Sequence, residues 1–434
     1  MRIARLLRDP AGHALGLMTL RSMTIAAKFA VTLFITRYLG LAEMGIYGLI
    51  ASASALAPVL LGFGVANNLG REAAMSGPAS ITVRLLQYFL FLIPTYIGLF
   101  AVSVLVWPGH SHWLCLLAVL LFLDHLQTEM FSLMTIAGGA YGANIAYFIR
   151  FAGWSLFYIP LALFEPSLRN LTAVLLFWLA GCVVASILTV FLTLNWQWGA
   201  AIRALPSSEL KLPHKHGSMA LYVGDAANVS FVYLDRYIVG IFLSPTMLGV
   251  YVLYWSITNA LNNLITISVV QIERGVLVKV AQSASHTLNH ALRQVCLTSS
   301  GMALALGGLA TVMMYVVVPH LGRPVAETYL PLMFVLSAAL ILRTLYEVVG
   351  ISFYAYGRDD LVLYSVVGVL IIALGLNLWL DPQIGIWGAG LALVASYAIG
   401  AVARAVMIVR GFRRRTAAGI QVRSDMAPVV ERPS

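Results

Sequence analysis

About twelve long apolar runs dominate the sequence, and they restrict the folds that this chain can adopt. Each run has about 20 residues, the length of helix that crosses the hydrocarbon core of a bilayer. In lipid, every backbone polar group must be bonded within the protein, and a helix achieves this within one segment. The sequence therefore predicts an all-α integral membrane protein with helices at 17–38, 44–66, 83–106, 113–136, 143–164, 171–194, 219–243, 247–271, 295–318, 329–352, 361–380 and 385–409.

Composition agrees with a membrane protein. Hydrophobic residues make up 60% of the chain and charged residues only 10%, with a mean hydropathy of +0.89, whereas soluble domains are roughly 25% charged. The net charge of +10 could indicate a nucleic-acid partner. The basic residues, however, lie mostly in short loops between apolar runs, where positive charge orients membrane helices. We therefore expect no nucleic acid to bind.

Basic residues also predict the orientation of the chain. If the N-terminus is cytoplasmic, the loops outside hold little positive charge beyond Arg37, Arg169 and Arg323. Positive residues concentrate on the cytoplasmic side of membrane proteins, so we expect both termini to be cytoplasmic. The predicted inside segments contain Arg2, Arg5, Arg8, Arg71, Arg203, Lys211, Lys215, Arg274, Lys279, Arg293, Arg358, Arg413, Arg414 and Arg415.

A polar stretch at 195–218 divides the helices into two sets of six. We predict an N-terminal bundle over 1–194, a cytoplasmic linker over 195–218, a C-terminal bundle over 219–410 and a disordered cytoplasmic tail over 411–434. The motif "RYLGLAEMGIY" at 37–47 recurs loosely as "RYIVGIFLSPTMLGVY" at 236–251. Repeats of six helices keep the same orientation, which predicts a pseudo-twofold axis along the membrane normal and a cavity between the halves.

Several predicted helices contain cations and amides that are costly in lipid, at about 2.5–3.5 kcal/mol for a mid-membrane charge. Thr24 and Thr32 share a stripe with two of the cations on the first helix. Cations in a cavity favour an anionic ligand, and amides suit sugar hydroxyls. Alternatively, these groups hold helices together, and Arg21 extends to the interface. The candidate substrate-binding residues are Arg21, Lys28, Arg150, Arg343, Asn259, Asn262 and Asn263.

Acidic residues in the same helices are candidates for coupling to an ion gradient. They are Asp124, Glu129, Asp225, Asp235 and Glu347. His125 lies one turn from Glu129, a combination that suits proton handling. A purely structural alternative pairs Asp124 with Arg150 or Lys28, and Glu347 with Arg343. Adjacent helical residues do not face each other, so we expect Asp235 and Arg236 to have separate partners or to lie near the outer interface.

The motifs of nucleotide-driven and catalytic proteins are missing from the sequence. It contains no GxxxxGK[ST], HExxH, GxSxG or CxxC motif. The three cysteines lie in apolar runs, and the histidine pairs at 109–112 and 213–217 lack further metal ligands. We therefore expect no cofactor, no metal site and no enzymatic activity. Without ATP, transport would be driven by an H⁺ or Na⁺ gradient or by the gradient of the substrate itself.

The segments "KFAVTLFITRYLGLAEMGIYGLIASASALAPVLLGFGVANNLGREAA" (28–74) and "DRYIVGIFLSPTMLGVY" (235–251) resemble bacterial polysaccharide flippases of the Wzx type. These belong to the MATE-like multidrug/oligosaccharidyl-lipid/polysaccharide exporter superfamily. The resemblance implies two six-helix bundles in a V-shaped, alternating-access arrangement. It also implies transfer of undecaprenyl-pyrophosphate-linked oligosaccharides to the periplasmic leaflet, with the pyrophosphate on Lys28, Arg21 and Arg150, and next on Arg343. Related lipid II flippases usually have two further helices, which this chain lacks.

The resemblance further implies the bacterial inner membrane as location and lipopolysaccharide O-antigen, capsule or exopolysaccharide biosynthesis as context. Expected partners are the lipid-linked oligosaccharide, membrane lipid, a coupling H⁺ or Na⁺, and a polysaccharide polymerase with other assembly proteins. An ion-coupled multidrug or small-solute antiporter of the same superfamily is the main alternative. Its substrates are often cationic, so a cavity with unpaired cations argues against it. A third hypothesis is a non-transporting scaffold for polysaccharide assembly.

Overall fold

The computed structural model describes residues 10–205, 218–270, 277, 285–355 and 358–417. Within these ranges the chain forms helices and no strand, which confirms the all-α prediction. Half of the predicted linker and most of the predicted tail lie outside the described residues, as do the predicted inside cations Arg2, Arg5, Arg8, Lys211, Lys215, Arg274 and Lys279. The helix α19 continues to Ala417, beyond the domain boundary predicted at 410.

The first half of the chain contains the predicted helices, several of them interrupted. The long elements are α2 (Pro10–Phe34), α3 (Leu41–Leu61), α4 (Val65–Ser76), α5 (Thr82–Val106), α6 (Ser111–Ile136), α7 (Ala140–Phe148), α8 (Ser155–Phe164) and α9 (Leu171–Leu192). Two π-helical segments, η1 (Ile35–Leu39) and η4 (Ile149–Gly153), extend α2 and join α7 to α8. The connections contain η2 (Pro78–Ser80), η3 (Pro108–His110), η5 (Pro166–Leu168), η6 (Leu194–Trp196) and α10 (Trp198–Ala204).

In the second half, the predicted helix 219–243 is divided at Leu234 into two helices. The pair Asp381-Pro382 is typical of a turn, yet it lies inside a helix, because the chain continues helically to Ile384. The elements are α11 (Ser218–Tyr233), α12 (Asp235–Phe242), α13 (Pro245–Ile265), η8 (Thr266–Val270), α15 (Ser285–Val317), η9 (Val318–Leu321), α16 (Pro324–Thr328), α17 (Leu332–Ala355), α18 (Asp359–Ile384) and α19 (Ile386–Ala417).

Ten helices in the described part of the chain are long and apolar enough to cross a membrane. The two remaining predicted spans correspond to the α11–α12 pair and to α13, whose polar residues lower their hydropathy. Large apolar side chains such as Leu105, Phe164 and Leu309 are more than half exposed. Water would disfavour such a surface, whereas lipid accepts it, so these side chains face the bilayer.

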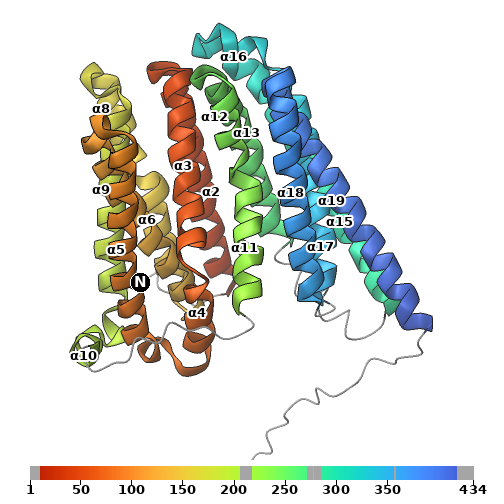
Figure 1. Cartoon of the computed structure of the whole chain (residues 1–434), viewed down its shortest axis with the longest axis horizontal. Helices are drawn as coiled ribbons and strands as arrows, with labels where there is room; N and C mark the ends of the chain where they lie inside the picture. Colours follow the sequence, from red (N-terminus) through yellow and green to blue (C-terminus); the bar gives the residue numbers. More distant parts are fainter. Residues whose placement is uncertain (1–9, 206–217, 271–276, 278–284, 356–357, 418–434) are drawn as a thin grey trace, which may run out of the picture.

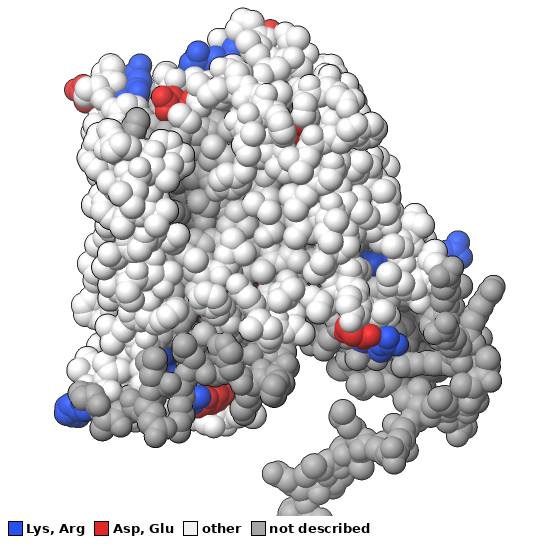
Figure 2. All heavy atoms as spheres, in the orientation of Figure 1, with Lys and Arg blue, Asp and Glu red and all other residues white. Residues whose placement is uncertain are grey.

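The helices form two groups that meet at one end and separate at the other (Figure 1). The end where they meet carries α16, and the opposite end carries α4 and α10 on one side and the tips of α15, α17 and α19 on the other. We call these the α16 end and the α4 end; the sequence predicts that the α4 end faces the cytoplasm. Figure 2 shows a notch in the outline between the two groups at the α4 end.

Glycine permits the close contact between the halves toward the α16 end. The helices α3 and α13 cross there, and a Cβ at Gly45 would lie 2.5 Å from the carbonyl oxygen of Pro245. A Cβ at Gly48 would lie 2.5 Å from the Val252 side chain. Arg323, just before α16, donates 2.9 Å hydrogen bonds to the carbonyl oxygens of Thr36 and Arg37 in the opposite half.

Candidate functional site

Lys28 is a cation without an acidic partner. Its Nζ lies 3.8 Å from the ring centre of Phe151 and 5.7 Å from that of Tyr147. In the described part of the chain, no carboxylate forms an ion pair with it, and the side chain is only partly buried. Aromatic faces stabilise a cation without neutralising it. The ammonium therefore remains available to an anionic ligand.

Arg21 lies two turns from Lys28 on α2, nearer the α4 end. Its Nε donates a 3.1 Å hydrogen bond to Oδ1 of Asn144 on α7, and the guanidinium is partly exposed. The hydroxyls of Thr24 and Thr32, in the predicted stripe, instead bond to carbonyl oxygens of their own helix. Of the four polar residues in this predicted stripe, the two cations are therefore those that remain for a ligand.

Arg150 is not a free cation, because it forms a buried ion pair. Its Nε lies 3.3 Å from Oδ1 of Asp124, and both side chains are almost completely buried. Its Nη1 donates 3.0 Å hydrogen bonds to the Asp124 carbonyl oxygen and to Oγ1 of Thr128. Ser54 also donates to the Asp124 carboxylate. The geometry is that of the structural alternative, in which this pair joins α3, α6 and η4.

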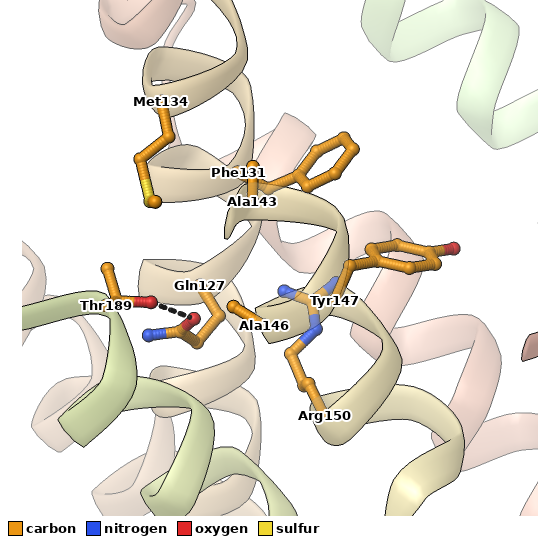
Figure 3. A pocket seen from close by; sticks show the side chains of 8 residues that line it. All are labelled: Gln127, Phe131, Met134, Ala143, Ala146, Tyr147, Arg150 and Thr189. Atoms are coloured by element: carbon orange, nitrogen blue, oxygen red, sulfur yellow. Dashed lines mark hydrogen bonds between the residues drawn. The ribbon is translucent and has the colours of Figure 1, made fainter. Parts of the chain in front are cut away.

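The π-helical segment η4 places Arg150 beside Phe151, whose ring centre lies 3.9 Å from the guanidinium carbon. Phe151 thus contacts both Arg150 and Lys28. Figure 3 shows the small pocket next to Arg150, with the hydrogen bond between Thr189 and Gln127 on its other side. This pocket has no room for a water molecule, so it does not bind substrate in this conformation.

His125, Glu129, Tyr88 and Tyr96 form a second buried cluster, which we call the histidine cluster. His125 Nε2 lies 2.9 Å from Oη of Tyr88 and 3.4 Å from Oε1 of Glu129, and Nδ1 lies 3.1 Å from Oη of Tyr96. The His125 side chain has no exposed surface, whereas that of Glu129 is 11% exposed. The sequence indicated that His125 and Glu129 share a face, but it did not indicate the two tyrosines on α5.

In the second half, four predicted residues come together in one network. Arg343 Nε bonds to Oε1 of Glu347 at 2.9 Å, and its Nη1 bonds to Oδ1 of Asn259 at 2.9 Å. Asn262 donates to Oε1 of Glu347 at 3.1 Å. An adjacent pocket, lined in part by Arg343 and Asn259, has room for about one water molecule. Asn263, by contrast, is exposed.

The adjacent charges Asp235 and Arg236 have separate partners, as expected. Asp235 accepts hydrogen bonds from the hydroxyl of Tyr251 and from the backbone N–H of Arg236. Arg236 donates a 2.6 Å hydrogen bond to Ser52 in the opposite half, and its guanidinium carbon lies 3.3 Å from the ring centre of Trp255. Both side chains are buried, so the prediction that Arg236 anchors the membrane interface is wrong.

Asp381 is a buried acid that is not among the coupling residues predicted from the sequence. It is completely buried on α18, and neither carboxylate oxygen has a hydrogen-bond partner in the described part of the chain. Its charge is close enough to interact electrostatically with Asp235 and Tyr251. An unpartnered buried carboxylate is costly unless it binds a proton or a cation, so Asp381 is a candidate position for such binding.

Asp225 lies apart from the other acids, near the α4 end of α11. It is exposed, and its Oδ2 accepts a 3.0 Å hydrogen bond from Asn67 of α4. Tyr222, on the same helix, donates a 2.9 Å hydrogen bond to the carbonyl oxygen of Leu60 at the end of α3. These two bonds connect the halves near the α4 end. Asp225 is therefore a contact between the halves in this conformation.

These features define a helical membrane protein with two groups of helices and buried charges between them, and solved structures of transporters share its fold. An inward-facing multidrug resistance MATE family transporter of the MOP superfamily superimposes with a TM-score of 0.62 at 12% identity, covering 94% of this chain and 99% of that chain. The lipid II flippase MurJ in an inward closed conformation gives a TM-score of 0.60 at 13% identity, covering 91% of this chain and 87% of that chain. An outward-facing multidrug resistance MATE family transporter gives a TM-score of 0.54 at 16% identity, covering 96% of this chain and 98% of that chain.

At these identities the comparisons establish a shared fold. No protein-family model and no curated protein matches the chain. The solved structures are described as transporters and a flippase, and this chain shares their fold.

Proposed function

We propose that this protein is a flippase for lipid-linked oligosaccharides with an anionic headgroup, such as undecaprenyl-pyrophosphate-linked units of the bacterial inner membrane. The observation that carries the proposal is the α2 face with Arg21 and Lys28. Lys28 is held by aromatic rings and has no carboxylate partner in the described residues, so no neighbouring acid competes with a phosphate for it. Cationic drugs would be repelled by the same face.

The arrangement of the helices supports alternating access as the mechanism. In this conformation the two helix groups are apart at the α4 end, although α11 still contacts α3 and α4 there, while Arg323 and the glycines of α3 and α13 close the α16 end. A headgroup could enter from the α4 end beside Arg21 and reach Lys28 further along α2. Its lipid tail would remain in the bilayer. Release requires the opposite state, in which the contacts at the α16 end are broken.

Coupling to an ion gradient would use acids that are not already neutralised. Asp124 and Glu347 form ion pairs with arginines, and Asp225 forms an exposed contact between the halves. Glu129 and Asp235 are the predicted acids that are buried without an arginine within ion-pair distance in the described residues. We therefore place ion coupling at these two positions, with Asp381 as the partner of Asp235.

Binding of a prenyl pyrophosphate to the purified protein in detergent tests this function. We expect the wild type to bind farnesyl or undecaprenyl pyrophosphate and not the corresponding uncharged alcohol. Lys28→Glu should weaken binding at least about tenfold, because a charge-assisted hydrogen bond contributes about 1.5–3 kcal/mol and 1.4 kcal/mol is a factor of ten. Lys28→Arg should bind nearly as well as the wild type.

The control for this test is Arg203→Glu, which reverses an exposed charge on α10 away from the α2 face. It should leave binding unchanged. If Lys28→Glu binds prenyl pyrophosphate as tightly as the wild type, the proposed function is wrong. Tight binding of a lipophilic cation by the wild type, strengthened by Lys28→Glu, would instead support the multidrug antiporter.

A further inference from the structure

Three aromatic rings form a continuous row that begins beside Lys28. The ring centre of Phe151, on η4, lies 3.8 Å from the Lys28 ammonium and 4.7 Å from the ring centre of Tyr147 on α7. The ring centre of Tyr147 lies in turn 5.1 Å from that of Phe131 on α6. We call Phe151, Tyr147 and Phe131 the aromatic row. It continues the cationic face of α2 with rings that carry no charge.

The aromatic row extends from Lys28 toward the α4 end. Phe131 lies little more than one helical turn before Ile136, and a Cβ at Gly70 of α4 would lie 2.7 Å from the Ile136 side chain. The proposed headgroup enters from this end and reaches Lys28. The part of the substrate that is attached beyond its phosphates would therefore lie along the row.

The rings of the row have surface that is not used by the dry pocket next to Arg150. In Figure 3, Phe131 and Tyr147 extend away from Met134 and Thr189, so this pocket lies behind them. The three side chains of the row are only partly buried. The hydroxyl of Tyr147 lies at the outer end of its ring, away from the pocket. The row therefore presents ring surface and one hydroxyl to a ligand beside α2.

The electrostatics of the row favour a neutral ligand with polarised C–H groups. The face of an aromatic ring carries partial negative charge. A pyranose ring presents C–H groups with partial positive charge on its face, while its hydroxyls project at the rim and can bond to a group such as the Tyr147 hydroxyl. A cationic ligand could also stack on aromatic rings, but Lys28 and Arg150 already contact Phe151 and repel further positive charge.

The spacing of the row fits a short chain of sugars. Its ring centres are 4.7 Å and 5.1 Å apart, close to the length of one hexopyranose unit, so successive rings can contact successive sugars. Mostly apolar walls with a few polar groups that fix orientation are typical of small-molecule sites.

We propose that the aromatic row binds the first sugars of the transported glycan by stacking, while Lys28 and Arg21 hold the phosphates. This assignment deepens the proposed function and rests on it for the lipid-linked form of the substrate. The row itself binds pyranose rings even without a phosphate, but more weakly, because the cations then have no ligand.

The test compares two kinds of ligand on the purified full-length protein. One is farnesyl pyrophosphate, and the other is farnesyl pyrophosphate that carries one glucose, galactose or N-acetylglucosamine on its terminal phosphate. The readout is the ratio of the two affinities. We expect the wild type to bind at least one glycosylated lipid about threefold to tenfold more tightly, the factor that an aromatic contact contributes beyond its buried area.

Variants of the row should lower this ratio toward one. Phe131→Leu and Tyr147→Leu remove a ring but keep apolar volume, whereas Tyr147→Phe keeps the ring and should retain most of the ratio. The matched control is Phe334→Leu, which removes one ring of an aromatic pair with Tyr315 on the exposed apolar surface and should leave the ratio unchanged. Thermal unfolding checks that each variant is folded, and if one leucine variant is not, the other carries the test.

Two results would overturn the assignment. One is a ratio close to one for all three sugars in the wild type. The other is a ratio that stays at the wild-type value in the folded leucine variants, which would show that the rings only fill space between α6 and α7.

A second measurement separates this assignment from the proposed function. If farnesyl pyrophosphate itself does not bind, the proposed function is wrong, and the row is then tested with methyl glycosides of the same sugars by saturation-transfer-difference NMR. The detergent must lack a sugar headgroup. Saturation transfer to the sugar C–H protons that is lost in the leucine variants supports the row. Absence of transfer, or equal transfer in the variants, refutes it.

Discussion

Gly249 of α13 lies directly against the backbone carbonyl of Leu41 at the start of α3, so closely that a Cβ at this position would overlap the oxygen. Gly45, its counterpart in the sequence repeat, contacts Pro245 and Gly249 from the other side. The repeated glycine is therefore the crossing point of the two halves. In the conformation described here this contact helps to close the α16 end.

Gly249→Ala is expected to destabilise the conformation described here by about 1–3 kcal/mol, the usual cost of overpacking a tight contact. The halves should shift toward states in which the α16 end is open, measured as increased labelling of cysteines introduced between α3 and α13. Gly301→Ala on α15 is the matched control, because a Cβ there meets no atom within 4 Å. Equal labelling in both variants would contradict the role of this crossing.

The Asp124–Arg150 pair gives a second prediction. Arg150→Met leaves a buried carboxylate without its partner, and the loss of one member of a buried pair costs about 3–5 kcal/mol. The melting temperature should fall sharply and should recover in the double variant Asp124→Asn, Arg150→Met. Arg358→Gln, which breaks an exposed ion pair with Asp360, should leave the melting temperature unchanged. A stable Arg150→Met variant with weakened headgroup binding would instead indicate a direct role in substrate binding.

Arg236 should act as a link between the halves. Arg236→Gln removes the bond to Ser52 and the contact with Trp255, and we expect a loss of about 2 kcal/mol or more. Ser52→Ala should produce a smaller loss in the same direction. The thermal stabilities of the two variants and of their combination form a double-mutant cycle, and purely additive losses would show that the two residues do not interact.

Replacement of the Asp381 carboxylate is expected to raise the stability of the protein. Because its carboxylate is buried without hydrogen-bond partners, Asp381→Asn removes a group that is costly when charged, and we expect thermal stability to rise by about 1 kcal/mol or more near neutral pH. The same substitution should reduce ion-dependent transport in proteoliposomes. A clear loss of stability would mean that Asp381 has a structural partner.

Local patterns in the sequence predicted the features that depend on neighbours along one helix. The apolar runs marked the helices, and the four-residue spacings placed Glu347 beside Arg343 and Glu129 beside His125. The predictions of these pairs succeeded because a regular helix brings residues four positions apart together, independently of the rest of the fold.

Partners that come from other helices were not predictable in this way. Ser52 is 184 positions from Arg236, and only the packing of α3 against α12 brings them together. The π-helical segment η4 changes the register of its helix, which places Arg150 beside Asp124. Asp381 looked like a turn residue because proline follows it, yet α18 extends past both. Partners supplied by other helices also determine which cations are neutralised and which remain free for a ligand.

Arg323 binds the backbone of Thr36 and Arg37, not their side chains. Every residue type at positions 36 and 37 offers the same carbonyl oxygens, so both side chains can change during evolution without loss of these two hydrogen bonds. Position 323 has no such freedom, since lysine lacks the planar fork of donors that reaches two carbonyls at once. Homologues that keep arginine at position 323 while varying at 36 and 37 would retain this contact between the halves.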